Sequence, residues 1–471
     1  MTGFASLPTR IGGGLKRAFS QFLALPITVV VGFIAITAVI YWADEAWSAG
    51  RTPAQFSWLG ELLGDSSSLA TLLGTIASSI ITVTSITFSL LLIALQQGAS
   101  ALTTQVTDQF LMRRTNQFYF GYFVGLSVFT LLSLVTASSI HRPIFGTSLI
   151  LILTIVALCM IVVMIYDTID QMRPTQIVRA IHQHVLRARG REAALLAATR
   201  RQPRADWFVV GQLRSTETGH IIAVKADKLG KAIAAIGCGD IEVELRVPIG
   251  RYLAFGDPMA TLRAPTAGAL DPEVLDRVRE AIGQSMGFHD ARDLRQDPSY
   301  GISQLSTIAW TSISTAKSNP APGLAVIQSL RDILARWSAD GPVEGDAQSL
   351  VVIPDVAPME VIATFENIFL VTSESIQAQT LAYAIKAVAI LLETVPASWR
   401  AGLAEASRRL LSSLGEHVLT VELESALFEL AAALTAQGYA ETAQSVQAAT
   451  ATLATTLGTL NSRSTRVPGT A

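Results

Sequence analysis

The sequence is poor in cysteine and in charge, and each shortage excludes a class of protein. Only two cysteines occur, Cys159 in an apolar run and Cys238 in IGCGD, which is too few for a disulfide framework or a paired zinc site. Charged residues make up 15% of the chain, and the formal net charge is -2. Because nucleic-acid binding requires a basic face that neutralises phosphates, this balance argues against a nucleic-acid partner.

Signatures of catalysis are scarce too. The sequence has no HExxH zinc motif and no phosphate-binding glycine loop. Its histidines are scattered apart from His182 and His184, and side chains two residues apart on a helix point in different directions. We therefore expect neither an enzyme nor a bound metal or other cofactor.

What the sequence does have is apolar length. Half of its residues are hydrophobic and the mean hydropathy is +0.43, which is high for a soluble protein. Four segments reach the roughly 20 residues that a spanning helix needs. They are residues 22–42, 70–97, 118–138 and 145–166. These segments predict a mainly α membrane protein with a transmembrane domain over 22–170, in which the first span is retained rather than cleaved as a signal peptide.

Basic residues set the expected orientation. Lys16 and Arg17 precede the first span, Arg113 and Arg114 separate the second from the third, and several arginines follow the fourth. Since Lys and Arg are retained on the cytoplasmic side, this alternation places both termini, including the segment 1–21, in the cytoplasm. The lipid bilayer is thus the first expected partner.

The remainder of the chain predicts cytoplasmic domains. A basic linker helix is expected over 171–206, followed at 207–265 by a small β-domain whose strands FVVGQLRS, GHIIAV, IEVELRV and MATLRA enclose a helical insert. This β-segment resembles the barrel-sandwich fold of carrier domains. Apolar residues at helical spacing then predict a helical bundle over 266–458, and the tail 459–471 lacks core-forming residues and is expected to be disordered.

The second span carries an unusual polar pattern. Thr75, Thr82, Ser89 and Gln96 fall seven residues apart, and Ser78 and Ser85 fill the intermediate positions. At helical spacing these six side chains form one stripe, which we call the polar seam. Two interpretations remain open: the hydroxyls permit close packing within the four-helix bundle, or several subunits place the seam around a hydrated path for ions.

Two further polar groups are candidates for function. Asp108, Arg113 and Arg114 lie where the second span reaches the cytoplasm and could form the mouth of such a path. A cytoplasmic cluster, Arg292, Asp293 and Asp297, stands before a predicted helix start, where Asp297 either caps the helix or helps to form an anion site.

Four stretches resemble one known family in the expected order. They are LATLLGTIASSIITVTSITFSLLLIALQQGAS, DQFLMRRTNQFYFGYFVGLSVFTLLSL, GRYLAFGDPMATL and RDLRQDPSYGISQLSTIA. They resemble the bacterial predicted membrane proteins of the domain of unknown function twenty-two fifty-four, over nearly the whole chain to about residue 340. The resemblance implies an inner-membrane protein with amino-terminal spans and a cytoplasmic carboxy-terminal part, and it implies no activity.

The sequence therefore favours an oligomeric, channel-like protein of the bacterial inner (plasma) membrane. Its spans would conduct ions or small solutes through a central pore in a homo-oligomer, gated by the cytoplasmic domains. The alternative is a membrane-anchored scaffold or sensor without permeation.

Overall fold

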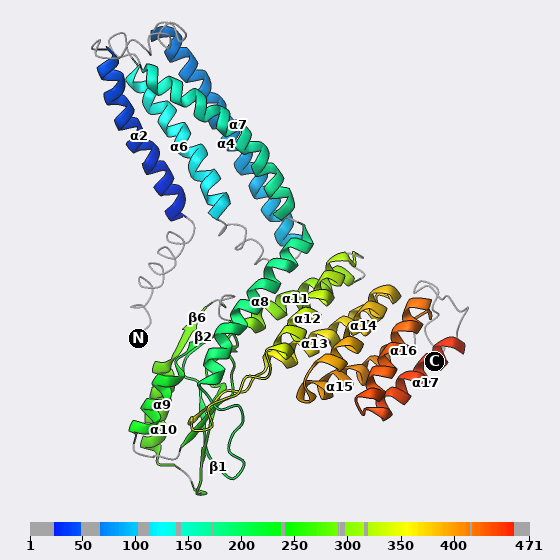
Figure 1. The fold of residues 1–471 in the computed structure, drawn as a ribbon. Coiled ribbons are helices and arrows are strands. Elements are labelled where there is room, and N and C mark those ends of the chain that lie inside the picture. The colour runs from blue at the N-terminus through cyan, green and yellow to red at the C-terminus, as the bar shows by residue number, and fades with distance from the viewer. Residues whose placement is uncertain are drawn as a thin grey trace. The chain divides into compact units, whose positions relative to one another are not determined.

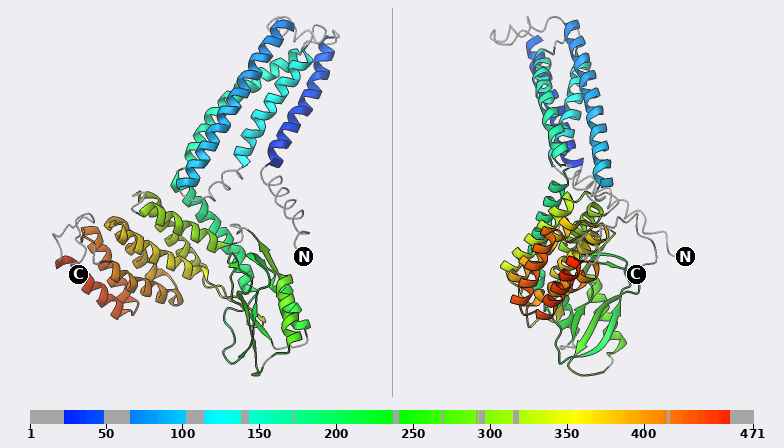
Figure 2. Two further views of the ribbon diagram at one scale, coloured as in Figure 1. Left: turned by 180° about the vertical axis from the view of Figure 1, so that it is seen from behind. Right: turned by 90° about the vertical axis from the view of Figure 1, so that its right-hand side faces the viewer.

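The computed structural model describes residues 23–48, 66–101, 114–137, 143–171, 173–236, 241–268, 270–290, 292, 297–314, 319–414 and 417–455. The chain divides into two compact units, Met1–Gln176 and Ile177–Ala471 (Figures 1 and 2). The predicted segments 1–21 and 459–471 lie outside the described residues.

The described part of the first unit contains four helices that are long and apolar enough to cross a membrane. They are α2 (Ala24–Ser48), α4 (Ser66–Ala101), α6 (Arg114–Thr136) and α7 (Ile144–Gln171). These helices confirm the four predicted spans, and α4 extends beyond the predicted 70–97 at both ends. Large apolar side chains such as Ile155 and Val162 on α7 are exposed, as lipid-facing positions require.

Helices α6 and α7 each pack against the other three helices of this unit, and the most extensive contact joins α6 to α2. The stretch GYFVG places Gly121 and Gly125 on one face, where small residues let two backbones approach closely. A Cβ atom at Gly125 would overlap a ring carbon of Phe33, and one at Gly121 would lie 2.9 Å from the Cα of Pro26. Both glycines therefore permit the α2–α6 contact.

A buried acid joins α2 to α7. Asp44, near the end of α2, is only 1% exposed. Its carboxylate accepts hydrogen bonds from the backbone N–H groups of Phe145 (2.7 Å) and Gly146 (3.1 Å), which have no intrahelical partner in the first turn of α7. Asp44 thus stabilises the start of the fourth membrane helix from the neighbouring span.

The second unit begins with helix α8 (Pro174–Ala197) and a β-region. Strands β1 (Phe208–Arg214), β5 (Pro258–Ala264), β3 (Glu242–Leu245) and β7 (Val351–Val352) form one sheet in that order. Strands β4 (Tyr252–Leu253), β2 (Gly219–Val224) and β6 (Met286–His289) form the other. Helices α9 (Ala226–Ala235) and α10 (Pro272–Ser285) contribute Leu229, Val278 and Ile282 to the core that the strands share.

The predicted domain boundary at 265 is wrong. Helix α10 and strand β6 belong to the β-region, since β6 pairs antiparallel with β2 and Ile282 is buried in the same core. Strand β7 also joins this region, and it pairs in parallel with β3 from about a hundred residues farther along the chain. These pairings are non-local, so a local pattern of apolar residues does not reveal them. The linker helix predicted over 171–206 is α8, which begins at Pro174, a residue favoured in the first turn of a helix.

Seven helices complete the described part of the second unit. They are α11 (Pro298–Ile313), α12 (Ala321–Ala339), α13 (Ala357–Glu374), α14 (Ala378–Thr394), α15 (Ala397–Leu414), α16 (Val421–Ala436) and α17 (Ala440–Thr455). Helices α12, α14 and α16 pack in one layer and the odd-numbered helices in a second, so that each helix contacts the next but one (Figure 1). This arrangement confirms a helical region and is typical of stacked helical repeats. The apolar helix α14 is not among the candidate membrane spans; it packs between α12 and α16 within its layer, and its Lys386 pairs with Glu429 at 3.0 Å.

Candidate functional site

The polar seam lies on the exposed face of α4. Its six predicted members, Thr75, Ser78, Thr82, Ser85, Ser89 and Gln96, are all exposed. The residues that pack α4 against the rest of the unit are instead Leu69, Leu73, Ile76, Ala77 and Ile80. At about 100° of rotation per residue, these two sets fall on opposite sides of the helix. The interpretation that the seam packs within a single four-helix unit is therefore wrong.

The seam hydroxyls bond to their own helix. Thr75, Ser78, Thr82 and Ser89 each donate a hydrogen bond to the carbonyl oxygen four residues earlier, over 2.8–3.0 Å. Each hydroxyl proton is thus engaged along the helix, while the lone pairs of the oxygen point outward. The seam presents a line of hydrogen-bond acceptors, which suits cations or water.

The same spacing extends the seam at one end and interrupts it at the other. Ser68 and Thr71 continue the alternation of three and four residues, and both are exposed. The position between Ser89 and Gln96 is Leu92, whose side chain is 46% exposed. Sequence reasoning missed these three residues, although one further repeat of the spacing would have found them. Leu92 is the single apolar residue in a polar series from 68 to 96.

The cytoplasmic-mouth candidates are described only in part. Asp108 and Arg113 lie outside the described residues. Arg114 is the first residue of α6, and its side chain is exposed.

The predicted cytoplasmic cluster is a helix cap. Asp297 is 1% exposed and accepts the backbone N–H of Tyr300 at 3.0 Å, which caps α11. Arg292 donates to the same carboxylate at 2.8 Å and lies over the Tyr300 ring. Burial raises the pKa of Asp297, and the Arg292 charge opposes this rise. Asp293 lies outside the described residues. The carboxylate and guanidinium neutralise each other, which is the arrangement of a structural cap.

A second charged cluster in this unit was not predicted. Arg189 on α8 forms a two-pronged ion pair with Asp355 (2.7 and 2.6 Å) and a third contact with Glu192 (2.7 Å). Trp337 of α12 stacks on the guanidinium, 4.9 Å from ring centroid to Cζ. Burial raises the pKa of Glu192 to about 7, against the opposing charge of Arg189. We call these residues the Arg189 cluster; Asp355 is 166 residues from Arg189, so no sequence spacing reveals the pair.

The described residues were searched for a serine nucleophile and for a cluster of metal ligands. Residues 283–287, GQSMG, match the GxSxG pattern of serine hydrolases, but Ser285 is 2% exposed and ends a helix that leads into a strand. A nucleophile elbow has the reverse order, strand then helix, and an exposed serine. Among the described residues, no group of three or more His, Cys, Asp or Glu side chains is placed to hold a metal ion.

Comparison with known proteins identifies the family. The family model for predicted membrane proteins, DUF2254, matches residues 20–380. No curated protein and no solved structure matches the chain. The matched residues include the four membrane helices and most of the second unit. The chain therefore belongs to the DUF2254 family of predicted membrane proteins.

Proposed function

We propose that the protein is a channel-like homo-oligomer of the bacterial inner membrane, in which the polar seams of several protomers surround a path for ions or small solutes. Both termini lie in the cytoplasm, the cytoplasmic domains gate the path, and the protein has no catalytic activity. The observation that carries the proposal is the position of the seam, which faces away from every packed helix of its own unit.

The dimensions of the seam support a path across the membrane. From Ser68 to Gln96 the helix rises roughly 42 Å, which exceeds the roughly 30 Å of a bilayer's hydrocarbon core. The seam carries no charged residue, and its hydroxyl oxygens can replace part of an ion's hydration shell without trapping the ion. A line of outward acceptors gains nothing from lipid, whereas water or a cation in a pore would satisfy it.

Leu92 is then the natural constriction of the path. A ring of one leucine from each protomer would interrupt a hydrated seam, and apolar constrictions close pores by excluding water. The gate would lie between Ser89 and Gln96. Regulation by the cytoplasmic domains would act by widening this ring.

Ion flux through the purified protein in liposomes tests the proposal. The parent is compared with the double variant Thr82→Leu plus Ser89→Leu, with Leu92→Ser, and with the control Thr28→Leu, which changes an exposed, back-bonded threonine of α2. We expect flux that the double variant abolishes, that Leu92→Ser raises at least about tenfold, and that the control leaves unchanged. All variants are compared at equal amounts of folded, inserted protein.

Each contrary outcome has a defined meaning. If neither the parent nor Leu92→Ser conducts at varied voltage, tension and salt, the permeation proposal fails and the membrane-anchored scaffold or sensor is favoured. If the parent conducts and the double variant conducts equally, the path lies elsewhere. If Leu92→Ser leaves the flux unchanged while the double variant abolishes it, the pore stands and the leucine gate fails.

A further inference from the structure

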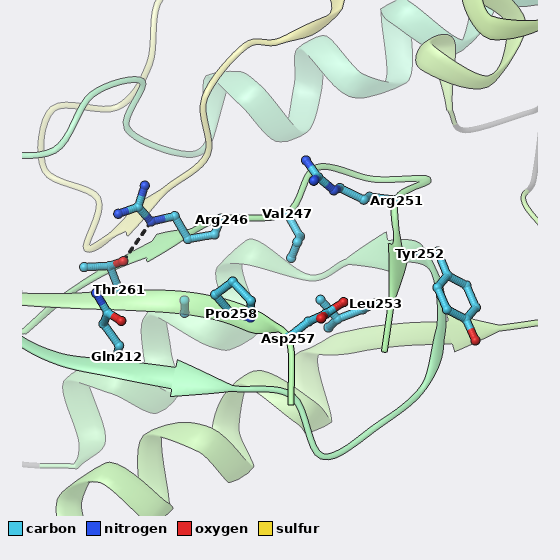
Figure 3. Close-up of a pocket in the computed structure, with 10 residues that line it drawn as sticks. Gln212, Arg246, Val247, Arg251, Tyr252, Leu253, Asp257, Pro258 and Thr261 are labelled. Carbon is cyan, nitrogen blue, oxygen red and sulfur yellow. Dashed lines mark hydrogen bonds between the residues drawn. The ribbon is translucent and has the colours of Figure 1, made fainter. Parts of the chain in front are cut away.

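A pocket of about 470 Å³ opens on the β-region of the second unit (Figure 3). Its volume falls within the range of small-molecule sites. The floor is apolar, because Val247, Leu253 and Ala260 line it and belong to the buried core of the β-region. Gln212 and Tyr252 add exposed polar groups at the rim.

Two arginines stand on one side of the pocket, both from the connection between β3 and β4 (Figure 3). Arg246 is oriented by a hydrogen bond from its Nε to the hydroxyl of Thr261 (2.9 Å), a residue that is only 2% exposed. Its nearest carboxylate, Glu244, is 3.9 Å away and lies closer to Arg263, at 3.3 Å. Arg246 is therefore held in place with its charge only partly neutralised.

Arg251 lies at the other end of the same connection. Its backbone is fixed, since its carbonyl accepts the N–H of Ile221 at 3.1 Å, and its side chain is exposed. The single acid that lines the pocket, Asp257, accepts the N–H of Ala254 at 2.9 Å and so serves the turn that precedes β5. The charged groups that line the pocket thus sum to a positive charge.

We propose that this pocket binds a small soluble anion, a phosphate monoester or carboxylate with a short apolar body, whose charged group lies between Arg246 and Arg251. Guanidinium groups match the geometry of carboxylate and phosphate oxygens. The body would lie on the apolar floor. The inference does not depend on the proposed pore, because the site lies wholly within the second unit.

Isothermal titration on the full chain in detergent micelles tests the assignment, with phenyl phosphate as the probe. We expect a dissociation constant of about 1 mM or tighter, and at least about tenfold weaker binding of inorganic phosphate, which lacks the apolar body, and of benzyl alcohol, which lacks the charge. Arg246→Gln and Arg251→Gln should each weaken the binding of phenyl phosphate at least about tenfold. Arg277→Gln, an exposed arginine of α10 outside the pocket, should leave it unchanged.

The unliganded melting temperature of each variant checks its fold, and Arg246→Lys, which keeps the charge, should retain part of the affinity. Absence of phenyl phosphate binding to the parent would overturn the proposal. The proposal would also fail if Arg251→Gln bound phenyl phosphate as tightly as the parent does. If the parent bound inorganic phosphate as tightly as phenyl phosphate, the ligand would not need an apolar body.

Discussion

The polar seam of α4 and the Arg189 cluster satisfy their polar groups in opposite ways. The seam is exposed, uncharged and bonded to its own helix one turn away. The Arg189 cluster is buried and charged, and it is bonded across 166 residues of sequence. A group satisfied locally adds little to the stability of the fold and remains available to solvent or ligand. A group satisfied at long range holds distant segments together and has no such freedom.

The largest effect should follow from removing the charge at the centre of the Arg189 cluster. Arg189→Ala leaves the buried carboxyl group of Glu192 and the half-buried carboxylate of Asp355 without their common partner. Breaking a buried pair in this way typically costs about 3–5 kcal/mol. Urea unfolding of the full chain in micelles, followed by circular dichroism, measures the loss. Arg408→Ala, which removes an exposed pair with Glu405, is the control and should leave the stability nearly unchanged.

The pH dependence of the unfolding free energy should report the raised pKa of Glu192. Burial raises its pKa to about 7 in the folded state, against about 4.3 in the unfolded chain. Between these values the folded state binds more protons than the unfolded state, so the free energy of unfolding should fall by about 4 kcal/mol as the pH rises through this window and then level off.

The comparison of the parent with Glu192→Gln isolates this group, because burial also raises the pKa of Asp297 and of Glu360. The variant should lose most of the slope between about pH 4.5 and 7 and should be more stable than the parent at pH 8. Equal slopes in the two proteins would show that Glu192 is already charged when folded.

A substitution in the packed α2–α6 contact of the membrane unit should have an intermediate effect on stability. Gly125→Ala places a methyl group that overlaps the Phe33 ring and should destabilise the α2–α6 contact by about 1–3 kcal/mol. Gly74→Ala on α4 is a matched control, since a Cβ there meets nothing within 4 Å. Thermal unfolding in micelles gives both values. A loss as large for Gly74→Ala would place another helix against that part of α4.

The smallest effect on stability should come from the seam itself. Thr82→Val removes a hydroxyl that bonds only to Ser78 of its own helix, so the unfolding free energy should change by less than about 0.5 kcal/mol. Thermal unfolding in micelles measures this change as well. A large loss would show that the hydroxyl makes a contact on which the fold depends.

The same contrast explains what the sequence could predict. The four spans, strands β1, β2, β3 and β5, and the polar seam follow local periodicities of 3.6 or 2 residues, and each was predicted. The seam's extension to Ser68 and Thr71 follows from the same spacing. Which way the seam faces did not follow from it, because that depends on how Leu73 and Ile76 pack against other helices.

Features built from distant residues were not predictable. Strand β7 has only two residues, and its strand character comes from pairing with β3 rather than from its own pattern. The cap formed by Asp44 on α7 and the pair of Arg189 with Asp355 each join segments more than a hundred residues apart. A single sequence gives the chemistry of such groups but not their partners.

The most direct measurement is disulfide cross-linking through the seam. In a background with Cys159→Ala and Cys238→Ala, Thr82→Cys is compared in native membranes with Ile155→Cys, an exposed position on α7. If the seams of neighbouring protomers face one another, mild oxidation should link the Thr82→Cys protein into covalent dimers and leave the Ile155→Cys protein monomeric. Monomeric Thr82→Cys protein after oxidation, with Ile155→Cys cross-linked or not, would contradict the central claim.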